Sequence, residues 1–303
     1  MPSLSLNDRA DEDQWIWESF RYHSRTFSFA AYLLPRSVQM SVATLYLFCR
    51  RVDSIADQRV LEVGQERALS EVHEIRDRLD QTLAGHPPSD TILWRRLAEV
   101  HEHQPLPREP MYELIEGALW DLEGRPIASK EDLVDYSNLV GGSVGAMMLP
   151  FLAAEARHDG LEPAARRLGI AMQITNIVRD VGEDIDDLDR VYLPERWLET
   201  HDVPVTALEE ARVSNGYPDL LERAMDTAED YYETSFDGVS ALPLRSRYGI
   251  RAAARMYREI MNEVRANDYD NLTQRAYVST RRKLWLLLYD GYDRRKERLA
   301  PSD

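Results

Sequence analysis

Apolar side chains recur along this chain every three or four residues, which is the period of an α-helix. Turn-forming residues, such as Pro35 and the GHPPSD segment, separate the apolar stretches. The predicted helices span residues 12–20, 38–57, 64–83, 91–103, 109–121, 130–148, 163–184, 219–236, 246–266 and 280–298. We find no alternating pattern typical of strands and no long linker. The sequence therefore predicts an all-α protein, with residues 1–303 forming a single domain.

Two pairs of aspartates stand out because they interrupt strongly apolar segments. Asp53 and Asp57 lie in YLFCRRVDSIAD, and Asp180 and Asp184 lie in QITNIVRDVGED. A spacing of four residues places both carboxylates of a pair on one helix face. The surrounding apolar residues predict that this face is directed inward, where carboxylates are costly unless they are paired or bind a metal.

Each aspartate pair belongs to a longer polar stripe at helical spacing. The stripes consist of Tyr46, Arg50, Asp53 and Asp57 on the first segment and Gln173, Asn176, Asp180 and Asp184 on the second. A solvated helix face is the ordinary explanation for one such stripe, but two matching stripes favour a shared ligand. Hard oxygen donors on two helices suit Mg²⁺, which keeps several waters and is commonly shared with substrate phosphates. A diphosphate is therefore the predicted third partner.

The composition narrows the class of protein further. The chain has 303 residues, enough for a core that encloses a cavity, and a formal net charge of −16, which argues against nucleic-acid binding. The same charge would repel a diphosphate unless Mg²⁺ or arginines reverse the field locally. A single cysteine excludes an intramolecular disulfide, and the polar N-terminal segment is unlike a signal peptide. We expect a cytoplasmic protein.

Three other segments carry candidate chemistry. Ser24 and Arg25 in YHSRTFSFAAYLLP could hold phosphate oxygens, or the hydroxyls there could cap a helix. The glycines of SNLVGGSVGAMM would each cost about 1 kcal/mol in a helix, so either close helix packing or a groove for a long apolar ligand must compensate. The basic and aromatic residues between 265 and 283 could form a solvated face, close one end of a cavity, or meet anionic lipid.

Several of these motifs together resemble the phytoene/squalene synthase family of head-to-head prenyl transferases, and most closely its bacterial phytoene synthases. They are HSRTFS, YLFCRRVDSIAD, YSNLVGGSVG, QITNIVRDVGED with VYLP, and ANDYDNLTQRAYVSTRRKL, in the family's order. The resemblance implies the all-α isoprenoid synthase fold with a central cavity. It also implies that two geranylgeranyl diphosphates are joined through prephytoene diphosphate to 15-cis-phytoene in carotenoid biosynthesis. Mg²⁺, with Mn²⁺ as an alternative, would be the cofactor, and NADPH would not be needed.

The resemblance also implies roles for individual residues. The metal ligands would be Asp53, Asp57, Asn176, Asp180 and Asp184. The catalytic positions would be Tyr46, Arg50, Tyr136 and Tyr269. Further substrate contacts are expected from Ser24, Arg25, Arg179 and Tyr192, together with Gln173 and Asn176 of the second stripe.

The implied reaction passes through allylic cations, so the cavity must exclude water around the reacting carbons. We predict that Phe27, Val140, Gly141, Gly145 and Met148 form this apolar lining. The family usually has alanine where Gly141 stands, and the missing side chain is expected to widen the prenyl channel. Between Asp184 and Tyr192 the chain is also one residue longer than is usual in the family. The role of Tyr192 is therefore less firmly implied than the roles of the aspartates.

The implied substrate is half lipid and the product is wholly apolar. We therefore expect peripheral contact with a membrane surface, and enzymes that act later in carotenoid formation are candidate partners. The nearest alternative is an enzyme that joins two farnesyl diphosphates to dehydrosqualene, hydroxysqualene or, with NADPH, squalene. A noncatalytic lipid-binding or assembly protein is a more distant alternative, and it would be expected to lose metal ligands that this chain retains.

Overall fold

A computed structural model of the chain describes residues 9–153, 160–283 and 285–286, apart from the side chains of Arg25 and Thr26. This part of the chain contains no β-strand, which confirms the predicted all-α class. Its helical segments are α1 (Arg9–His23), α2 (Arg25–Ala31), α3 (Arg36–Ser54), η1 (Ile55–Arg59), α4 (Val60–Val63), α5 (Gln65–Leu83), α6 (Ile92–His103), α7 (Arg108–Glu123), α8 (Lys130–Ser137), η2 (Asn138–Gly142), α9 (Ser143–Leu152), α10 (Leu161–Leu188), α11 (Glu195–Thr200), α12 (Val205–Glu209), α13 (Tyr217–Ala241) and α14 (Leu244–Ala266). Most of the predicted helix 280–298 lies outside the described residues.

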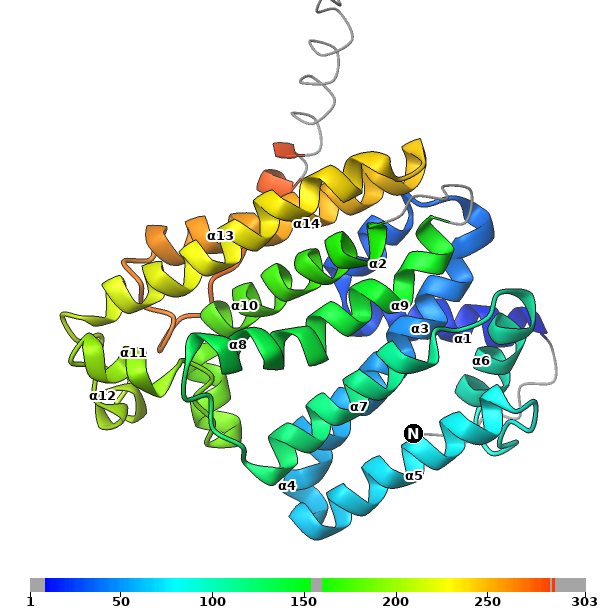
Figure 1. Cartoon of the computed structure of the whole chain (residues 1–303), viewed down its shortest axis with the longest axis horizontal. Helices are drawn as coiled ribbons and strands as arrows, with labels where there is room; N and C mark the ends of the chain where they lie inside the picture. The colour runs from blue at the N-terminus through cyan, green and yellow to red at the C-terminus, as the bar shows by residue number, and fades with distance from the viewer. Residues whose placement is uncertain (1–8, 154–159, 284, 287–303) are drawn as a thin grey trace, which may run out of the picture.

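Helix α10 lies at the centre of the bundle. It packs against α13 and α14 and, from another direction, against α8, η2 and α9. The second long inner helix, α3, contacts α1, α6, α7 and α9. In Figure 1, α13 and α14 run along one edge of the molecule, α5 lies at the opposite edge, and α11 and α12 lie at one end. Helices from both halves of the chain thus surround the two helices that carry the aspartate pairs.

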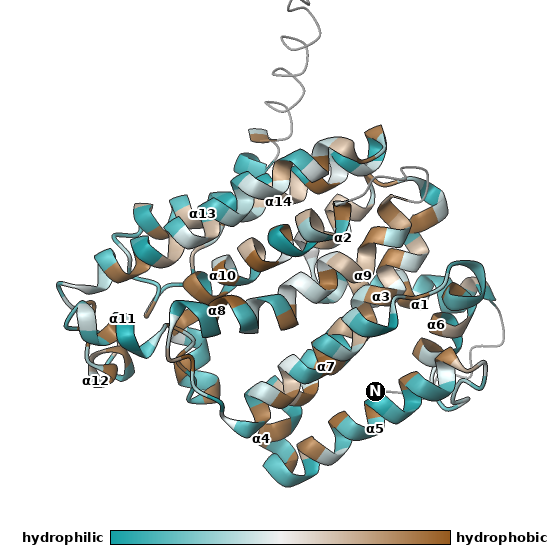
Figure 2. Ribbon diagram, viewed as in Figure 1, coloured by the Kyte–Doolittle hydropathy of each residue, from teal (hydrophilic) through white to brown (hydrophobic). Residues whose placement is uncertain are grey.

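The helices bury their apolar faces in one connected core. Figure 2 shows that α5 carries many hydrophilic residues, whereas α9 is apolar along most of its length. Because α9 packs against both α7 and α10, this apolar surface is largely covered. Nowhere in the described part of the chain does a helix combine the length and the apolar character that a membrane span requires.

Two of the predicted helices are interrupted by π-helical turns. The turn η1 follows α3 directly, so that Asp53 lies on α3 and Asp57 on η1. The turn η2 separates α8 from α9. A π turn holds an extra residue and changes the direction in which the following side chains project, and such turns are frequent at functional sites. The sequence period predicted continuous helices at both places and missed both turns.

The glycine-rich segment is explained by close packing against α10. A Cβ atom at Gly141 would lie 2.3 Å from the carbonyl oxygen of Gly169, and one at Gly145 would lie 2.2 Å from that of Ala165. Only glycine lets the two backbones approach this closely. The expectation that the missing side chain of Gly141 widens the channel was wrong, because a side chain there would be directed at the α10 backbone.

Candidate active site

The inner helices enclose two adjoining cavities. The first, with a volume of about 1510 Å³, is lined by carboxylates, arginines and tyrosines, and we call it the polar chamber. The second, of about 260 Å³, is lined mainly by apolar residues of α2, α3, α9 and α10, and we call it the apolar chamber. The residues that line both chambers are Phe27, Tyr46, Asp53, Val140, Gln173 and Asn176. The two chambers therefore meet beside the first aspartate pair.

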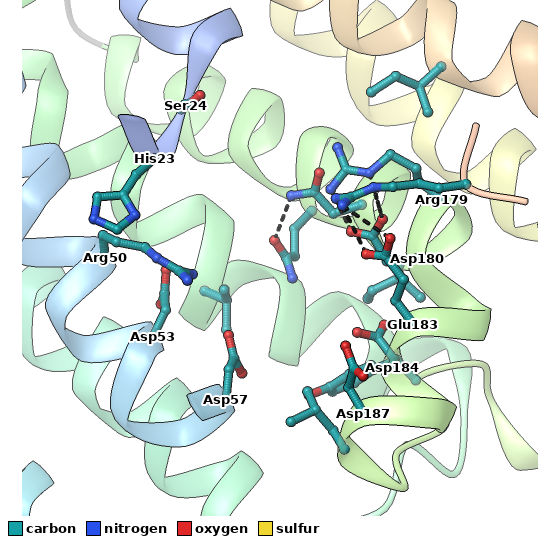
Figure 3. A pocket seen from close by; sticks show the side chains of 18 of the residues that line it. His23, Ser24, Arg50, Asp53, Asp57, Arg179, Asp180, Glu183, Asp184 and Asp187 are labelled. Atoms are coloured by element: carbon teal, nitrogen blue, oxygen red, sulfur yellow. Dashed lines mark hydrogen bonds and ion pairs between the residues drawn. The ribbon is translucent and has the colours of Figure 1, made fainter. Parts of the chain in front are cut away.

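The two aspartate pairs lie on facing walls of the polar chamber, which confirms their predicted inward orientation. Asp53 and Asp57 project from α3 and η1, and Asp180 and Asp184 project from α10 (Figure 3). Burial raises the pKa of Asp53 to about 8, and the nearby Asp57 adds to this rise. Burial also raises the pKa of Asp184 to about 8. The nearby carboxylates of Asp180 and, across the chamber, Asp57 add smaller contributions to this rise. The chamber thus concentrates negative charge that its interior does not stabilise.

Arginines neutralise one end of the second pair. Arg179 Nε lies 2.7 Å from Asp180 Oδ1, and Arg275 Nε lies 3.0 Å from the same oxygen. Arg275 also pairs with Glu183 at 2.9 Å. Tyr277 and Lys283 line the chamber together with Arg275, so part of the basic and aromatic segment borders the cavity.

The other carboxylates are less well compensated. Arg190 Nη1 lies 3.5 Å from Asp57 Oδ1, but neither Asp53 nor Asp184 forms an ion pair with any described residue. Asn176, which lies between the two chambers, leaves its Oδ1 atom buried without a hydrogen-bond partner. Buried polar atoms are normally satisfied, so these groups have the chemistry that a cation would satisfy.

The oxygen donors of the polar chamber fit an Mg²⁺ ion that also binds waters and substrate phosphates. No three His, Cys, Asp or Glu side chains among the described residues converge closely enough to hold a metal ion by themselves. The carboxylates of Asp53 and Asp184 and the amide oxygen of Asn176 are nevertheless hard oxygen donors on two facing helices. Mg²⁺ usually binds one or two carboxylates and completes its shell with waters and substrate phosphates. These residues thus fit an ion completed by a diphosphate.

Asp121 on α7 is a site residue that sequence reasoning missed. It accepts hydrogen bonds from the hydroxyls of Tyr136 at 3.0 Å and Tyr192 at 2.8 Å. The two tyrosine rings stack with centroids 5.0 Å apart, and all three residues line the polar chamber. Burial raises the pKa of Asp121 to about 6. Asp121 has no acidic partner at helical spacing within its own apolar segment, so the sequence carried no signal for it.

The predicted apolar residues lie where the sequence placed them. Val140, Gly141, Gly145 and Met148 line the apolar chamber. Phe27 lines both chambers and stacks on Tyr257 of α14 with ring centroids 5.1 Å apart. The glycines therefore satisfy both options left open by the sequence, because they pack closely against α10 and also border an apolar cavity.

The remaining predicted residues divide into three groups. Tyr46, Arg50, Gln173 and Arg179 line the polar chamber. Ser24 also lines it, but its hydroxyl caps α2 by accepting a hydrogen bond from the Phe27 amide at 3.1 Å; the Arg25 side chain lies outside the described residues. Tyr269 lines neither chamber, because its hydroxyl donates to Glu222 of α13 at 2.7 Å. A direct contact of Tyr269 with the reacting carbons does not fit this position.

An all-α bundle that places facing carboxylate walls beside an apolar chamber defines the class of isoprenoid synthases. The family model described as squalene/phytoene synthase matches residues 20–282. The phytoene synthase of Rhodobacter capsulatus is 38% identical over 275 residues, covering 89% of this chain and 78% of the relative. The 15-cis-phytoene synthase of Synechococcus elongatus is 31% identical over 296 residues, covering 93% of each chain.

A crystal structure of a dehydrosqualene synthase in complex with a ligand has the same fold. It matches with a TM-score of 0.83 and 30% identity, over 94% of this chain and 97% of the other. Together with the family match, these relatives show that the chain belongs to the squalene/phytoene synthase family. It is a prenyltransferase.

Proposed function

We propose that this chain is a 15-cis-phytoene synthase, which joins two geranylgeranyl diphosphates head to head through prephytoene diphosphate and releases diphosphate. The observation that carries the proposal is the direct connection of a carboxylate-lined chamber with an apolar one. A substrate with an anionic head and a long apolar tail matches that arrangement. The relatives named phytoene synthase support the choice of the twenty-carbon substrate and a place in carotenoid biosynthesis.

The metal would be held by Asp53, Asp57, Asn176, Asp180 and Asp184, which all line the polar chamber. A bound Mg²⁺ or Mn²⁺ would supply the positive charge that stabilises a diphosphate leaving group. The aspartates in this proposal are ligands and not general bases. Burial raises the pKa of Asp53 and of Asp184 to about 8, and a bound cation would favour the deprotonated form of both side chains.

Arginines would bind the diphosphate oxygens directly. Arg50, Arg179 and Arg275 line the polar chamber, and the last two pair with Asp180. Phosphate oxygens offer the same charge and hydrogen-bond geometry as a carboxylate, so these guanidinium groups can exchange one partner for the other. These guanidinium groups also offset part of the negative charge of the chamber.

The apolar residues would protect the carbocations from water. Phe27 and Val140 border the space next to the aspartates and offer no nucleophile. Tyr46 lies at the junction of the two chambers, and burial raises the pKa of its hydroxyl to about 12, so it stays neutral. A neutral tyrosine ring can stabilise a nearby cation through its face without being alkylated as a phenolate would be. The hydrogen bond from Tyr136 to Asp121 similarly fixes a second ring beside the chamber.

The test is a product analysis with defined substrates. The purified chain and Mg²⁺ are incubated with geranylgeranyl or farnesyl diphosphate, each with and without NADPH, and the product is identified by mass and ultraviolet spectrum. We expect phytoene from the twenty-carbon substrate, independent of NADPH. A product formed only from farnesyl diphosphate would overturn the proposal in favour of a fifteen-carbon enzyme. That second candidate is favoured by the likeness to the dehydrosqualene synthase structure.

Two further parts of the proposal concern the whole chain. We propose that it forms one domain, because α10 packs against helices that precede it, such as α8 and α9, and against α13 and α14, which follow. We also propose that the protein is cytoplasmic and meets the membrane peripherally, because its product would carry no polar group. Later enzymes of carotenoid formation would receive that product there.

A further inference from the structure

A groove of about 420 Å³ lies on the surface where the turn between α2 and α3 meets the start of α14. Tyr32, Arg36, Leu244 and Arg245 contribute to its lining. Leu244 is 55% exposed and Tyr32 is 48% exposed, and Phe29, one helical turn before Tyr32, is 39% exposed. We call these five residues the α2–α14 face. In Figure 1 the turn between α13 and α14 lies at the same corner of the molecule as α2.

The charge of this face is opposite to that of the rest of the chain. The chain has 53 acidic residues among 303, yet residues 19–52 and residues 238–258 contain none. These two stretches are the ones that meet at the groove, and each contributes an exposed arginine, Arg36 and Arg245. Neither arginine forms an ion pair with any described residue. The face therefore combines exposed apolar side chains with uncompensated positive charge.

We propose that the α2–α14 face is the surface on which this protein docks to a membrane that contains anionic phospholipid. Aromatic and aliphatic side chains that flank arginines match the boundary between acyl chains and headgroups, where rings and guanidinium stems are both accommodated. Each arginine near an anionic surface adds to the attraction. An acidic protein would otherwise be repelled by such a membrane. The absence of acidic residues from the two stretches that form this face lowers that repulsion where the membrane would bind.

The face lies next to the apolar chamber and far from the metal-binding end. Arg36 begins α3 and Asp53 lies near its end, a separation of about 25 Å along the helix axis. Leu34 lines both the groove and the apolar chamber. A Cβ atom at Gly249 would lie 3.0 Å from Leu34 Cδ2 and 3.3 Å from the Ala30 carbonyl oxygen, so α14 packs closely against this turn. Docking here would bring the lipid phase to the chamber that holds the apolar tails.

This inference gives a surface to the peripheral contact proposed above and rests on that proposed function for its purpose, but its test does not depend on turnover. The full chain is mixed with vesicles of pure phosphatidylcholine or of equal parts phosphatidylcholine and phosphatidylglycerol, and bound protein is measured by flotation. We expect binding to the anionic vesicles at low salt, and its loss near 1 M salt, where the Debye length is about 3 Å.

Variants locate the surface. The double substitution Arg36→Glu and Arg245→Glu should lower partitioning onto anionic vesicles on the order of 100-fold. Leu244→Ser should lower it by roughly tenfold, because an inserted apolar side chain is lost. The matched control is Arg196→Glu with Arg212→Glu, which changes the net charge equally on exposed positions near α11 and α12 at another end of the molecule. The control should keep most of its binding.

The outcomes separate the two proposals. Equal loss in the control pair would mean that net charge alone governs binding, and it would overturn the assignment of the face. Unchanged binding of Arg36→Glu/Arg245→Glu, or no vesicle binding by the parent chain, would also overturn it. So would the finding that the groove serves only to pair two copies of the chain in solution. All variants should retain parental helicity and parental turnover of detergent-dispersed substrate. If no variant or parent turns over prenyl diphosphate while the vesicle results hold, the proposed function fails and the docking surface stands.

Discussion

The polar chamber and the apolar chamber lie along the same helices, α3 and α10, but one is lined by many charged side chains and the other mainly by apolar ones. The polar chamber gathers carboxylates that need cations, and its two least compensated members, Asp53 and Asp184, have pKa values raised to about 8. Away from its junction with the polar chamber at Asp53, the apolar chamber is bordered by residues without charge, such as Val140, Gly145 and Met148. In the proposed reaction the first chamber stabilises a departing anion, and the second shelters the cation left behind.

The difference runs along α10 itself. Near its start, Gly169 and Ala165 let another helix approach to backbone contact, so this half serves packing and shape. From Gln173 onward the same helix directs polar side chains into the polar chamber. One rigid helix thus fixes the distance between the diphosphate end and the prenyl end of the site. Changes in either half should therefore have different consequences, which the following experiments measure.

The largest effect is expected from removing one charge of the polar chamber. Asp53→Asn should lower turnover with Mg²⁺ by roughly 10³-fold, because a ligand for the metal that stabilises the leaving group is lost. The same substitution should leave helicity unchanged and keep or raise the melting temperature of the metal-free protein, since a buried uncompensated carboxylate disappears. Steady-state kinetics and thermal unfolding would measure the two properties.

The control for this experiment is Asp186→Asn, which removes an exposed carboxylate from α10 outside the chamber lining. It should have nearly parental activity. Full activity of Asp53→Asn at saturating Mg²⁺ would show that the polar chamber does not work through a metal ion.

A substitution in the apolar chamber should act on chain length instead of ionisation. Met148→Trp would fill part of the space that holds the prenyl tail, and we expect turnover of the twenty-carbon substrate to fall about 100-fold. Turnover of the fifteen-carbon substrate should fall much less, and Mg²⁺ should stabilise the variant as it does the parent. Competition between the two substrates measures the ratio directly. An equal loss for both would mean that the chamber does not hold the tail.

Much of this division could be predicted from the sequence, because helical period and aspartate spacing are local properties. The apolar runs around Asp53 and Asp180 indicated both the helices and their inward faces. The π turns could not be predicted, since no residue type marks them and the helical period continues through both segments. They nevertheless decide how Asp57 projects relative to Asp53.

The residues that were missed or misplaced depend on contacts between distant segments. Asp121 enters the site because Tyr136 and Tyr192 bring their hydroxyls to it from other elements. Tyr269 belongs to a motif that resembles the family, but its orientation is set by Glu222 on α13, 47 positions earlier in the chain. A motif gives proximity along the chain, whereas the direction of a side chain depends on its partners.

The close contact between α9 and the first half of α10 predicts that replacing a glycine with alanine lowers stability instead of raising it. Gly145→Ala would ordinarily stabilise a helix by roughly 1 kcal/mol. Here the added Cβ atom would meet the Ala165 carbonyl oxygen at 2.2 Å, so we expect the free energy of unfolding to fall by about 2 kcal/mol. Denaturant unfolding measures it, with Ser70→Ala on the exposed face of α5 as the control. A stabilised Gly145→Ala protein would mean that α9 and α10 are not in backbone contact.

The smallest effect links the polar chamber to pH. Burial raises the folded-state pKa of Asp53 and Asp184 to about 8, against about 3.9 in an unfolded chain. Between these values the folded state binds more protons than the unfolded state, so the stability of the metal-free protein should fall as pH rises from about 4 to about 8.

Metal binding should oppose this loss, because a bound divalent cation favours the deprotonated carboxylates. We therefore expect Mg²⁺ to raise the melting temperature by only about 1 °C at pH 6 but by about 2–5 °C at pH 8. In the Asp53→Asn/Asp184→Asn double variant this difference between the two pH values should disappear, whereas Asp186→Asn should keep it. Equal stabilisation by Mg²⁺ at both pH values in the parent would mean that the ion binds elsewhere, and that the charge of the polar chamber serves the arginines alone.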